Sequence, residues 1–243
     1  MKIEICVDRV SSGVIAEKAG ATRLELCQDL SIGGTTPSFG LVKETLENVN
    51  IPVVLMIRPR AGDFCYDDYE FSCMLNDIEL FKELNIEGFV IGILKADGSI
   101  DAKRMKLAIE SAPNKDFIFH RAFDMSNNLD NSLEISKELG IKRILTGGGK
   151  QRAIDGIGVL EKLTKKSEDV IIMAGSGINL DNISKFKEIN ISEIHLSGKH
   201  FTQSKMQFRK KNISMGSVSK ESEYLIEEAS LEKIVKIVKA INS

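Results

Sequence analysis

The chain has 243 residues, of which 42% are hydrophobic and 28% are charged, and its formal net charge is −2. This balance is typical of a globular protein and excludes a disordered chain, and the scattered Lys and Arg residues argue against a nucleic-acid surface. The first seven residues lead directly into an expected strand, with no long apolar stretch. We therefore expect one cytoplasmic domain over residues 1–243, with no secretory signal and no membrane span.

Eight short, mostly apolar segments alternate along the chain with segments of helical spacing. In chain order, the expected strands are residues 3–7, 23–26, 53–57, 88–91, 117–120, 143–146, 170–174 and 193–196. Helical spacing is clear at Phe71, Leu75 and Ile78, and again in the last segment from Leu231 to Val238. Parallel strands need such crossovers, and the length matches one barrel. The predicted fold is α/β, a single (β/α)8 TIM barrel.

Alternation along the expected strands places charged and thiol groups inside the barrel. The residues that share a face, strand by strand, are Glu4, Cys6 and Asp8; Arg23, Glu25 and Cys27; Val54, Met56 and Arg58; Ile118 and His120; Ile144 and Thr146; and Glu193, His195 and Ser197. Unpaired buried charges are costly, so we expect one mutually paired cluster of Glu4, Glu25, Arg58, His120 and His195. Such a cluster could be catalytic, or it could only fill the barrel.

The third expected strand leads into a loop that contains two arginines, Arg58 and Arg60, on either side of a proline, followed by Asp63. Two guanidinium groups held close together suit a carboxylate or phosphate, since each offers a planar set of donors. The alternative is that Arg58 or Arg60 only pairs with Glu25 or Asp63.

The fifth expected strand ends in His120 and Arg121, at the end of the barrel where enzymes of this fold keep their catalytic groups. We expect His120 to act as a general acid, a general base or a metal ligand, and Arg121 to lie at the rim. A purely structural histidine is the alternative.

Glycine-rich turns follow the last three expected strands and begin at Thr146, Gly175 and Ser197. Such turns can expose backbone amides near helix N-termini, where anions bind. These turns therefore indicate a possible substrate site for a phosphorylated compound, although glycines also serve ordinary tight turns.

Four cysteines, Cys6, Cys27, Cys65 and Cys73, are present without a CxxC pair, so structural disulfides are not expected. Cys6 lies in the first expected strand and Cys27 directly follows the second. Neighbouring strands lie about 5 Å apart, so the two sulfurs could share one metal ion. Soft thiolates select Cu(I) or Zn(II), whereas buried apolar filling is the alternative for such cysteines.

Several longer motifs resemble the CutC family, whose members have a barrel fold and are named for copper homeostasis. The matching segments are residues 4–8, 23–27, 33–38, 56–60, 62–64, 119–124, 145–149, 193–195 and 206–209. The resemblance implies cytoplasmic copper handling, with Cu(I) bound by Cys6 and Cys27. The family turn after strand six often reads Thr-Ser-Gly, whereas this chain has Thr146, Gly147 and Gly148, so a serine-specific role there is not expected.

Two functional hypotheses follow. The first is a copper-homeostasis protein that binds Cu(I) through Cys6 and Cys27 at the barrel mouth. The second is an enzyme acting on a small carboxylated or phosphorylated substrate, with Arg58 and Arg60 as clamps, His120 as acid or base, and Glu4 or Glu25 as its partner. A non-catalytic scaffold is a third reading.

The long segment 199–230 lacks a helical period. We expect it to form a lid over the mouth or a homodimer contact through four apolar residues, Phe201, Met206, Phe208 and Met215, with an ordinary packed loop as the alternative.

Overall fold

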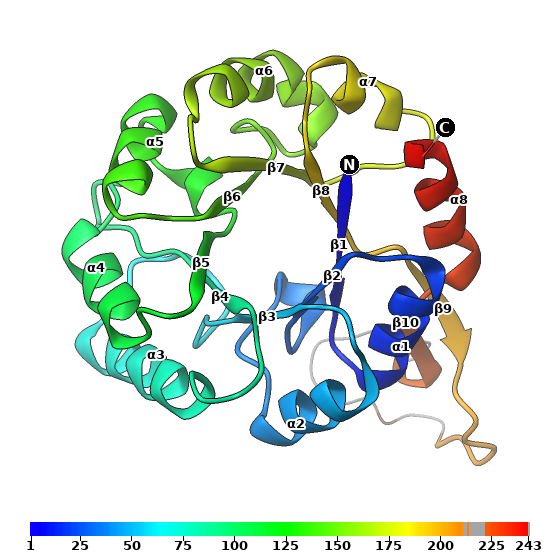
Figure 1. Cartoon of the computed structure of the whole chain (residues 1–243). Helices are drawn as coiled ribbons and strands as arrows, with labels where there is room; N and C mark the ends of the chain where they lie inside the picture. Colours follow the sequence, from blue (N-terminus) through cyan, green and yellow to red (C-terminus); the bar gives the residue numbers. More distant parts are fainter. Residues whose placement is uncertain (211–212, 214–221, 243) are drawn as a thin grey trace.

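In the computed structural model, which describes residues 1–210, 213 and 222–242, eight parallel strands close into a barrel inside a ring of helices (Figure 1). The barrel strands are β1 (Lys2–Val7), β2 (Arg23–Leu26), β3 (Val53–Met56), β4 (Gly88–Ile91), β5 (Asp116–Phe119), β6 (Arg143–Thr146), β7 (Ile171–Gly175) and β8 (Glu193–Leu196). They pair in sequence order, and β8 pairs with β1 to close the barrel. The predicted (β/α)8 barrel is confirmed, with the strand ends within one residue of those expected.

One helix follows each barrel strand and covers its outer face (Figure 1). The helices are α1 (Val10–Ala19), α2 (Phe39–Asn48), α3 (Asp68–Phe81), α4 (Ala102–Ser111), α5 (Leu129–Glu138), α6 (Ile157–Lys166), α7 (Ile183–Glu188) and α8 (Leu231–Asn242). Four of them begin at side chains that suit an N-cap: Ser38, Asp67, Asp101 and Asn128 each accept a hydrogen bond from the backbone N–H three residues further on. These caps define where the four helices begin after the loops at the C-terminal ends of the strands.

The apolar core has two layers, one between the strands and the helices and one inside the barrel. Ile3, Ile5 and Val7 of β1 belong to the outer layer. The inner layer consists of Cys27, Val54, Met56, Val90, Ile118, Leu145 and Met173. The prediction that Ile144 and Thr146 of β6 point into the barrel was therefore wrong: Leu145 points inward, and Ile144 packs in the outer layer. Thr146 lies on the same outer face as Ile144.

Buried ion pairs close the N-terminal end of the barrel. Arg23 Nε lies 2.5 Å from Glu4 Oε2, and Arg23 Nη2 lies 2.5 Å from Glu193 Oε2. Arg143 Nε contacts the same Glu193 oxygen at 3.1 Å, and Arg143 Nη2 pairs with Glu87 at 3.0 Å. Mutual pairing offsets the cost of burying these charges, so this cluster is part of the barrel's architecture.

The long segment after β8 forms a two-stranded antiparallel hairpin, β9 (Lys199–Gln203) and β10 (Leu225–Ala229). The hairpin lies beside α1 and α8, outside the ring of helices (Figure 1), and Ala229 N–H donates to Ser12 Oγ at 3.0 Å. Phe201, Met206 and Phe208 are exposed and do not line the barrel mouth, so the expected lid is not formed by them. Met215 lies outside the described residues. The homodimer contact stays a prediction.

Within the described part of the chain, no helix combines the length and the apolar character that crossing a membrane requires.

Candidate functional site

A cavity of about 880 Å³ opens at the C-terminal mouth of the barrel. Of the residues singled out in the sequence, those that line it are Cys6, Glu25, Arg58, His120, Arg121, His195 and Ser197. Much of the remaining lining is apolar and includes Met56, Phe64 and Leu145. A concave, mainly apolar space with a few converging polar groups is the usual form of a small-molecule site.

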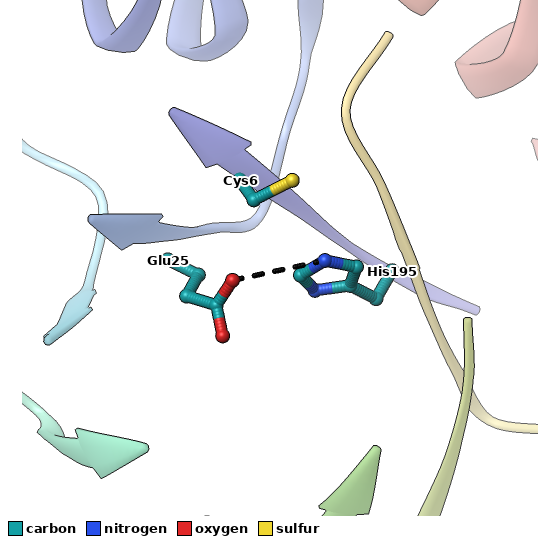
Figure 2. Close-up of side chains that lie close together, drawn as sticks. All are labelled: Cys6, Glu25 and His195. Carbon is teal, nitrogen blue, oxygen red and sulfur yellow. Dashed lines mark ion pairs between the residues drawn. The ribbon is translucent and has the colours of Figure 1, made fainter. Parts of the chain in front are cut away.

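Three potential metal ligands meet on one side of this cavity. Cys6 comes from β1, Glu25 from β2 and His195 from β8, and their side chains point toward one another in Figure 2. One ligand atom from each lies within 4.8 Å of the other two. The arrangement results from strand pairing, since β1 pairs with β2 on one side and with β8 on the other. A thiol, a carboxylate and an imidazole at this spacing can hold one metal ion.

Glu4 orients His195 from below. The Glu4 Oε1 atom lies 2.7 Å from His195 Nδ1. The other ring nitrogen, Nε2, lies 3.7 Å from Glu25 Oε2, the ion pair that Figure 2 marks. Burial raises the pKa of Glu4, but the hydrogen bond to His195 and the charge of Arg23 outweigh it and hold this pKa at about 2. A carboxylate that fixes one nitrogen of a histidine leaves the other nitrogen available to a metal or substrate.

Burial and neighbouring side chains shift the pKa values of His195 and Glu25. Burial opposes the charge on His195, but the Cys6 and Glu25 side chains outweigh it and raise the pKa of His195 well above its ordinary value. Burial raises the pKa of Glu25, although the charge of His195 opposes the shift. The neighbouring groups thus favour the protonated form of His195, whereas burial disfavours the ionised form of Glu25.

Cys27 lies next to this group without belonging to it. Its Sγ atom donates to Glu25 Oε2 at 3.5 Å, and its side chain packs in the inner apolar layer. Burial, followed by the nearby Glu25 and Cys6 groups, raises the pKa of Cys27 well above its ordinary value. Cys27 is therefore a protonated thiol that contacts the group of Cys6, Glu25 and His195 through Glu25.

Arg58 enters the cavity from the loop after β3, and it is held by backbone carbonyls. Its Nη1 atom donates to the carbonyl oxygens of Ile32 at 3.0 Å and Gly34 at 2.8 Å, and its Nη2 atom donates to Gly62 at 3.0 Å. Arg58 therefore does not join Glu4, Glu25 and His195 in the single paired cluster that the sequence suggested.

His120 is buried at the end of β5, also apart from the acidic group. Its Nδ1 atom accepts a hydrogen bond from Ala122 N–H at 3.1 Å, and its ring lies 4.7 Å from the Phe64 ring, between centroids. Burial and the nearby Arg58 charge lower the pKa of His120 to about 3. At neutral pH the ring is therefore uncharged.

The second arginine of the expected clamp points elsewhere. Arg60 pairs with Asp63 at 3.1 Å and, more closely, with Glu70, and its guanidinium carbon lies 5.1 Å from the centre of the Tyr66 ring. Neither Arg60 nor Asp63 lines the cavity. Of the two interpretations of this loop, the structure shows the ion pair between Arg60 and Asp63, and only Arg58 of the two arginines lines the cavity.

The glycine turn after β6 already holds an anion, the side chain of Asp124. This carboxylate accepts from Gly147 N–H at 2.8 Å and from Gly149 N–H at 2.9 Å, and it also bonds the Thr146 hydroxyl. Arg121 Nε donates to it at 2.8 Å. The expected exposed amides are therefore occupied internally. Asp124 was not singled out in the sequence, although its place just after the fifth strand was a usable signal.

The other two glycine turns lie at the mouth. Ser197 lines the cavity after β8, whereas Gly175 is buried at the end of β7, where an added Cβ would lie 2.4 Å from Leu145 Cδ1. Gly175 thus makes room for an inward side chain. Residues 176–181 line the cavity after β7, and Lys233 and Lys236 of α8 add positive charge at its rim, a contribution that the sequence pattern did not reveal.

Comparison with known proteins gives consistent matches over most of the chain. The model of the CutC family matches residues 1–200. The family protein CutC of Proteus mirabilis (strain HI4320) is 42% identical over 223 residues, which cover 92% of this chain and 89% of that protein. The corresponding protein of Pasteurella multocida (strain Pm70) is 43% identical over 225 residues and covers 92% of both chains.

Solved structures also resemble this chain in fold. A crystal structure from Streptococcus agalactiae, of a protein named CutC for copper homeostasis, has a TM-score of 0.76 and 31% identity and covers 81% of this chain and 98% of that one. Thiamine phosphate pyrophosphorylase from Pyrococcus furiosus has a TM-score of 0.59 at 15% identity, with 99% of this chain and 95% of that one covered. The second likeness concerns the fold alone.

Proposed function

The chain belongs to the CutC family, and we propose that it is a copper-homeostasis protein that binds Cu(I) as its cargo at the mouth of the barrel. The observation that carries this proposal is the meeting of Cys6, Glu25 and His195 within 4.8 Å. Thiolate and imidazole ligands suit Cu(I), which binds soft donors in preference to carboxylates. Cys6 and His195 are therefore the central ligands in this proposal, with Glu25 beside them.

Cys27 supplies the second thiolate in this proposal. Its Sγ atom already contacts Glu25 at 3.5 Å, and the Cys6 group is close enough to raise the pKa of Cys27. A metal ion must displace the proton from this thiol, because the thiolate is the metal ligand. Binding that uses Cys27 should thus release a proton and weaken as the pH falls.

The free thiols support a reducing compartment, and we include a cytoplasmic location in the proposal. All four cysteines are free, and Cys65 and Cys73 are exposed. Exposed free thiols are more typical of cytosolic proteins than of secreted ones, where disulfides form.

An anaerobic Cu(I) titration against a competing chelator tests the copper site. The wild type should outcompete the chelator, and Cys6→Ser and Cys27→Ser should each weaken Cu(I) binding by at least about tenfold, which corresponds to about 1.4 kcal/mol. The Cys65→Ser/Cys73→Ser double variant is the matched control, since neither thiol lines the cavity. If the Cys6→Ser/Cys27→Ser variant competes as well as the wild type, the copper proposal is wrong.

A second candidate function, an enzyme acting on a small anionic substrate, is supported by a different observation. Three cavity-lining residues have a buried polar atom without a hydrogen-bond partner among the described residues: Glu25 Oε1, Arg58 Nε and His120 Nε2. Such atoms are costly to bury and are commonly satisfied by a ligand. Under this hypothesis, turnover of a carboxylated or phosphorylated compound should persist in Cys6→Ser/Cys27→Ser and fall sharply in Arg58→Met.

A further inference from the structure

Two buried side chains with hydrogen-bond donors, Arg58 and His120, line the cavity. Their exposed fractions are only 6% and 4%. They contact the same aromatic ring: the Arg58 guanidinium carbon lies 5.2 Å from the centre of Phe64, and the His120 ring centre lies 4.7 Å from it. Both side chains therefore pack against Phe64, and the Arg58 charge is near enough to His120 to lower the pKa of its ring.

The hydrogen-bond pattern fixes which nitrogen of His120 carries the proton. Ala122 N–H donates to Nδ1 at 3.1 Å, so Nδ1 is the unprotonated acceptor. A neutral imidazole has one N–H, which must then be on Nε2. The low pKa of His120, about 3, keeps the ring neutral at physiological pH. Nε2–H is thus a buried donor, and no acceptor for it is present in the described part of the structure.

Arg58 is a buried cation that contacts uncharged groups. Its three hydrogen bonds go to the carbonyl oxygens of Ile32, Gly34 and Gly62, which orient the guanidinium without neutralising it. Among the described residues it forms no ion pair with a carboxylate within 4.0 Å, and its Nε–H has no acceptor. A buried cation of this kind favours an anionic partner.

From this geometry we propose that Arg58 and His120 form an oxyanion subsite, in which one oxygen-bearing group of a small organic anion accepts hydrogen bonds from both side chains. The shared chemistry of the ligand is an anionic oxygen, as in a carboxylate or a phosphate monoester. His120 serves as a neutral donor and not as a proton-transfer group. Such a donor can polarise or orient an oxygen without changing its own charge.

The surroundings limit what the rest of the ligand can be. Met56, Phe64 and Leu145 line the same cavity, so the part of the ligand next to the oxyanion is apolar or uncharged. The turn after β6 is already filled by Asp124 and does not compete for the ligand. If the protein is an enzyme, as in the second candidate function, its substrate must carry the anionic oxygen that this subsite binds. Binding of the anion alone requires neither turnover nor copper, so only the catalytic role of the subsite rests on that function.

Nitrogen-15 NMR of the imidazoles in the metal-free full-length protein tests the subsite, with acetate and inorganic phosphate as separate probes. His120 should be the Nε2–H tautomer and should stay neutral from about pH 8 to about pH 5, because its folded-state pKa lies well below this range. One probe or both should shift the His120 signals saturably. Isothermal titration calorimetry compares the variants, because two of them lack the His120 signal. Affinity should fall at least about tenfold in Arg58→Met and in His120→Phe, and it should be largely retained in His120→Gln, which keeps an N–H donor.

The matched control is His200→Gln, a histidine on the hairpin that does not line the cavity. Shifts that are not saturable, or that persist unchanged in Arg58→Met, would overturn the subsite for both probes. A protonated His120 near neutral pH would overturn its role as a neutral donor. Repeating the titration in Cys6→Ser/Cys27→Ser separates the two proposals, since copper binding should be lost there while anion binding remains.

Discussion

Arg23 Nη2 lies 2.5 Å from Glu193 Oε2 beneath the cavity, and both side chains are almost fully buried. Arg143 approaches the same oxygen at 3.1 Å, so one carboxylate serves two buried guanidinium groups. Arg23 also binds Glu4, and Glu4 forms a hydrogen bond with His195. The ion pair between Arg23 and Glu193 therefore helps to fix the position of His195. The ion pairs at one end of the barrel therefore support the site at the other.

We expect Glu193→Gln to be strongly destabilising. Removing one charge of a buried network leaves its partners uncompensated, which typically costs about 3–5 kcal/mol. Urea unfolding followed by circular dichroism measures the change. The matched control is Asp130→Asn, which removes an exposed carboxylate bonded to Lys162 and Lys166 and should have little effect. Equal losses in the two variants would contradict the role given to the buried cluster.

His120 should make the protein less stable as the pH falls. Its pKa is about 3 in the folded protein and is near its ordinary value of 6.5 in the unfolded chain, so only the unfolded state takes up a proton between these values. The free energy of unfolding should therefore drop by about 2 kcal/mol more in the wild type than in His120→Gln between about pH 7 and about pH 5.

Comparing these two proteins in the same buffers cancels the other titrating groups. Glu4, with a pKa of about 2, contributes equally to both, and so do His195 and Glu25. Parallel stability curves for the wild type and His120→Gln would show that His120 is not a buried neutral imidazole.

Gly92→Ala should displace His120. A Cβ at this position would lie 2.5 Å from His120 Cε1 and 2.7 Å from Phe119 Cε2, both atoms of buried rings that cannot move freely. We expect a loss of about 1–3 kcal/mol from overpacking, together with shifted His120 NMR signals. The control is Gly158→Ala, where an added Cβ meets nothing within 4 Å; that variant should unfold at the same urea concentration or a higher one.

The exposed apolar residues of the hairpin predict self-association. Phe201, Met206 and Phe208 are 63%, 54% and 69% exposed, which is unusual for large apolar side chains close together in sequence. If they form a homodimer contact, Phe201→Ser/Phe208→Ser should convert a dimer to a monomer in light scattering without altering Cu(I) binding. A wild-type protein that is monomeric at all accessible concentrations would exclude this contact.

Sequence periodicity predicted the barrel because each buried strand is a short apolar run and each crossover has helical spacing. It also predicted the inward side chains of β1, β2 and β8, where Glu4, Glu25 and His195 follow strict alternation. It failed on β6, where the polar Thr146 suggested the inward face, but its hydroxyl bonds Asp124 and Leu145 points inward instead. A shift of one residue in the assumed register moves every side chain of a strand to the opposite face.

The cavity's electrostatics were less accessible from sequence. The partners of Arg58 and Arg60 depend on how the loop after β3 folds, because Arg58 meets backbone carbonyls and Arg60 meets Glu70. Residue type alone does not reveal such contacts. Similarly, the tautomer of His120 depends on the Ala122 amide, which only the turn after β5 places against Nδ1.

The Asp124 carboxylate that fills the turn after β6 has an evolutionary consequence. A turn that recognises a ligand through backbone amides keeps that ability through most side-chain changes, because every residue except proline has an amide N–H. In this barrel the amides of Gly147 and Gly149 already bind the Asp124 carboxylate. The donors that have no partner belong instead to side chains, those of Arg58 and His120. A single substitution removes either donor. The ligand preference of this barrel can therefore diverge among relatives while the turn and the fold around it stay the same.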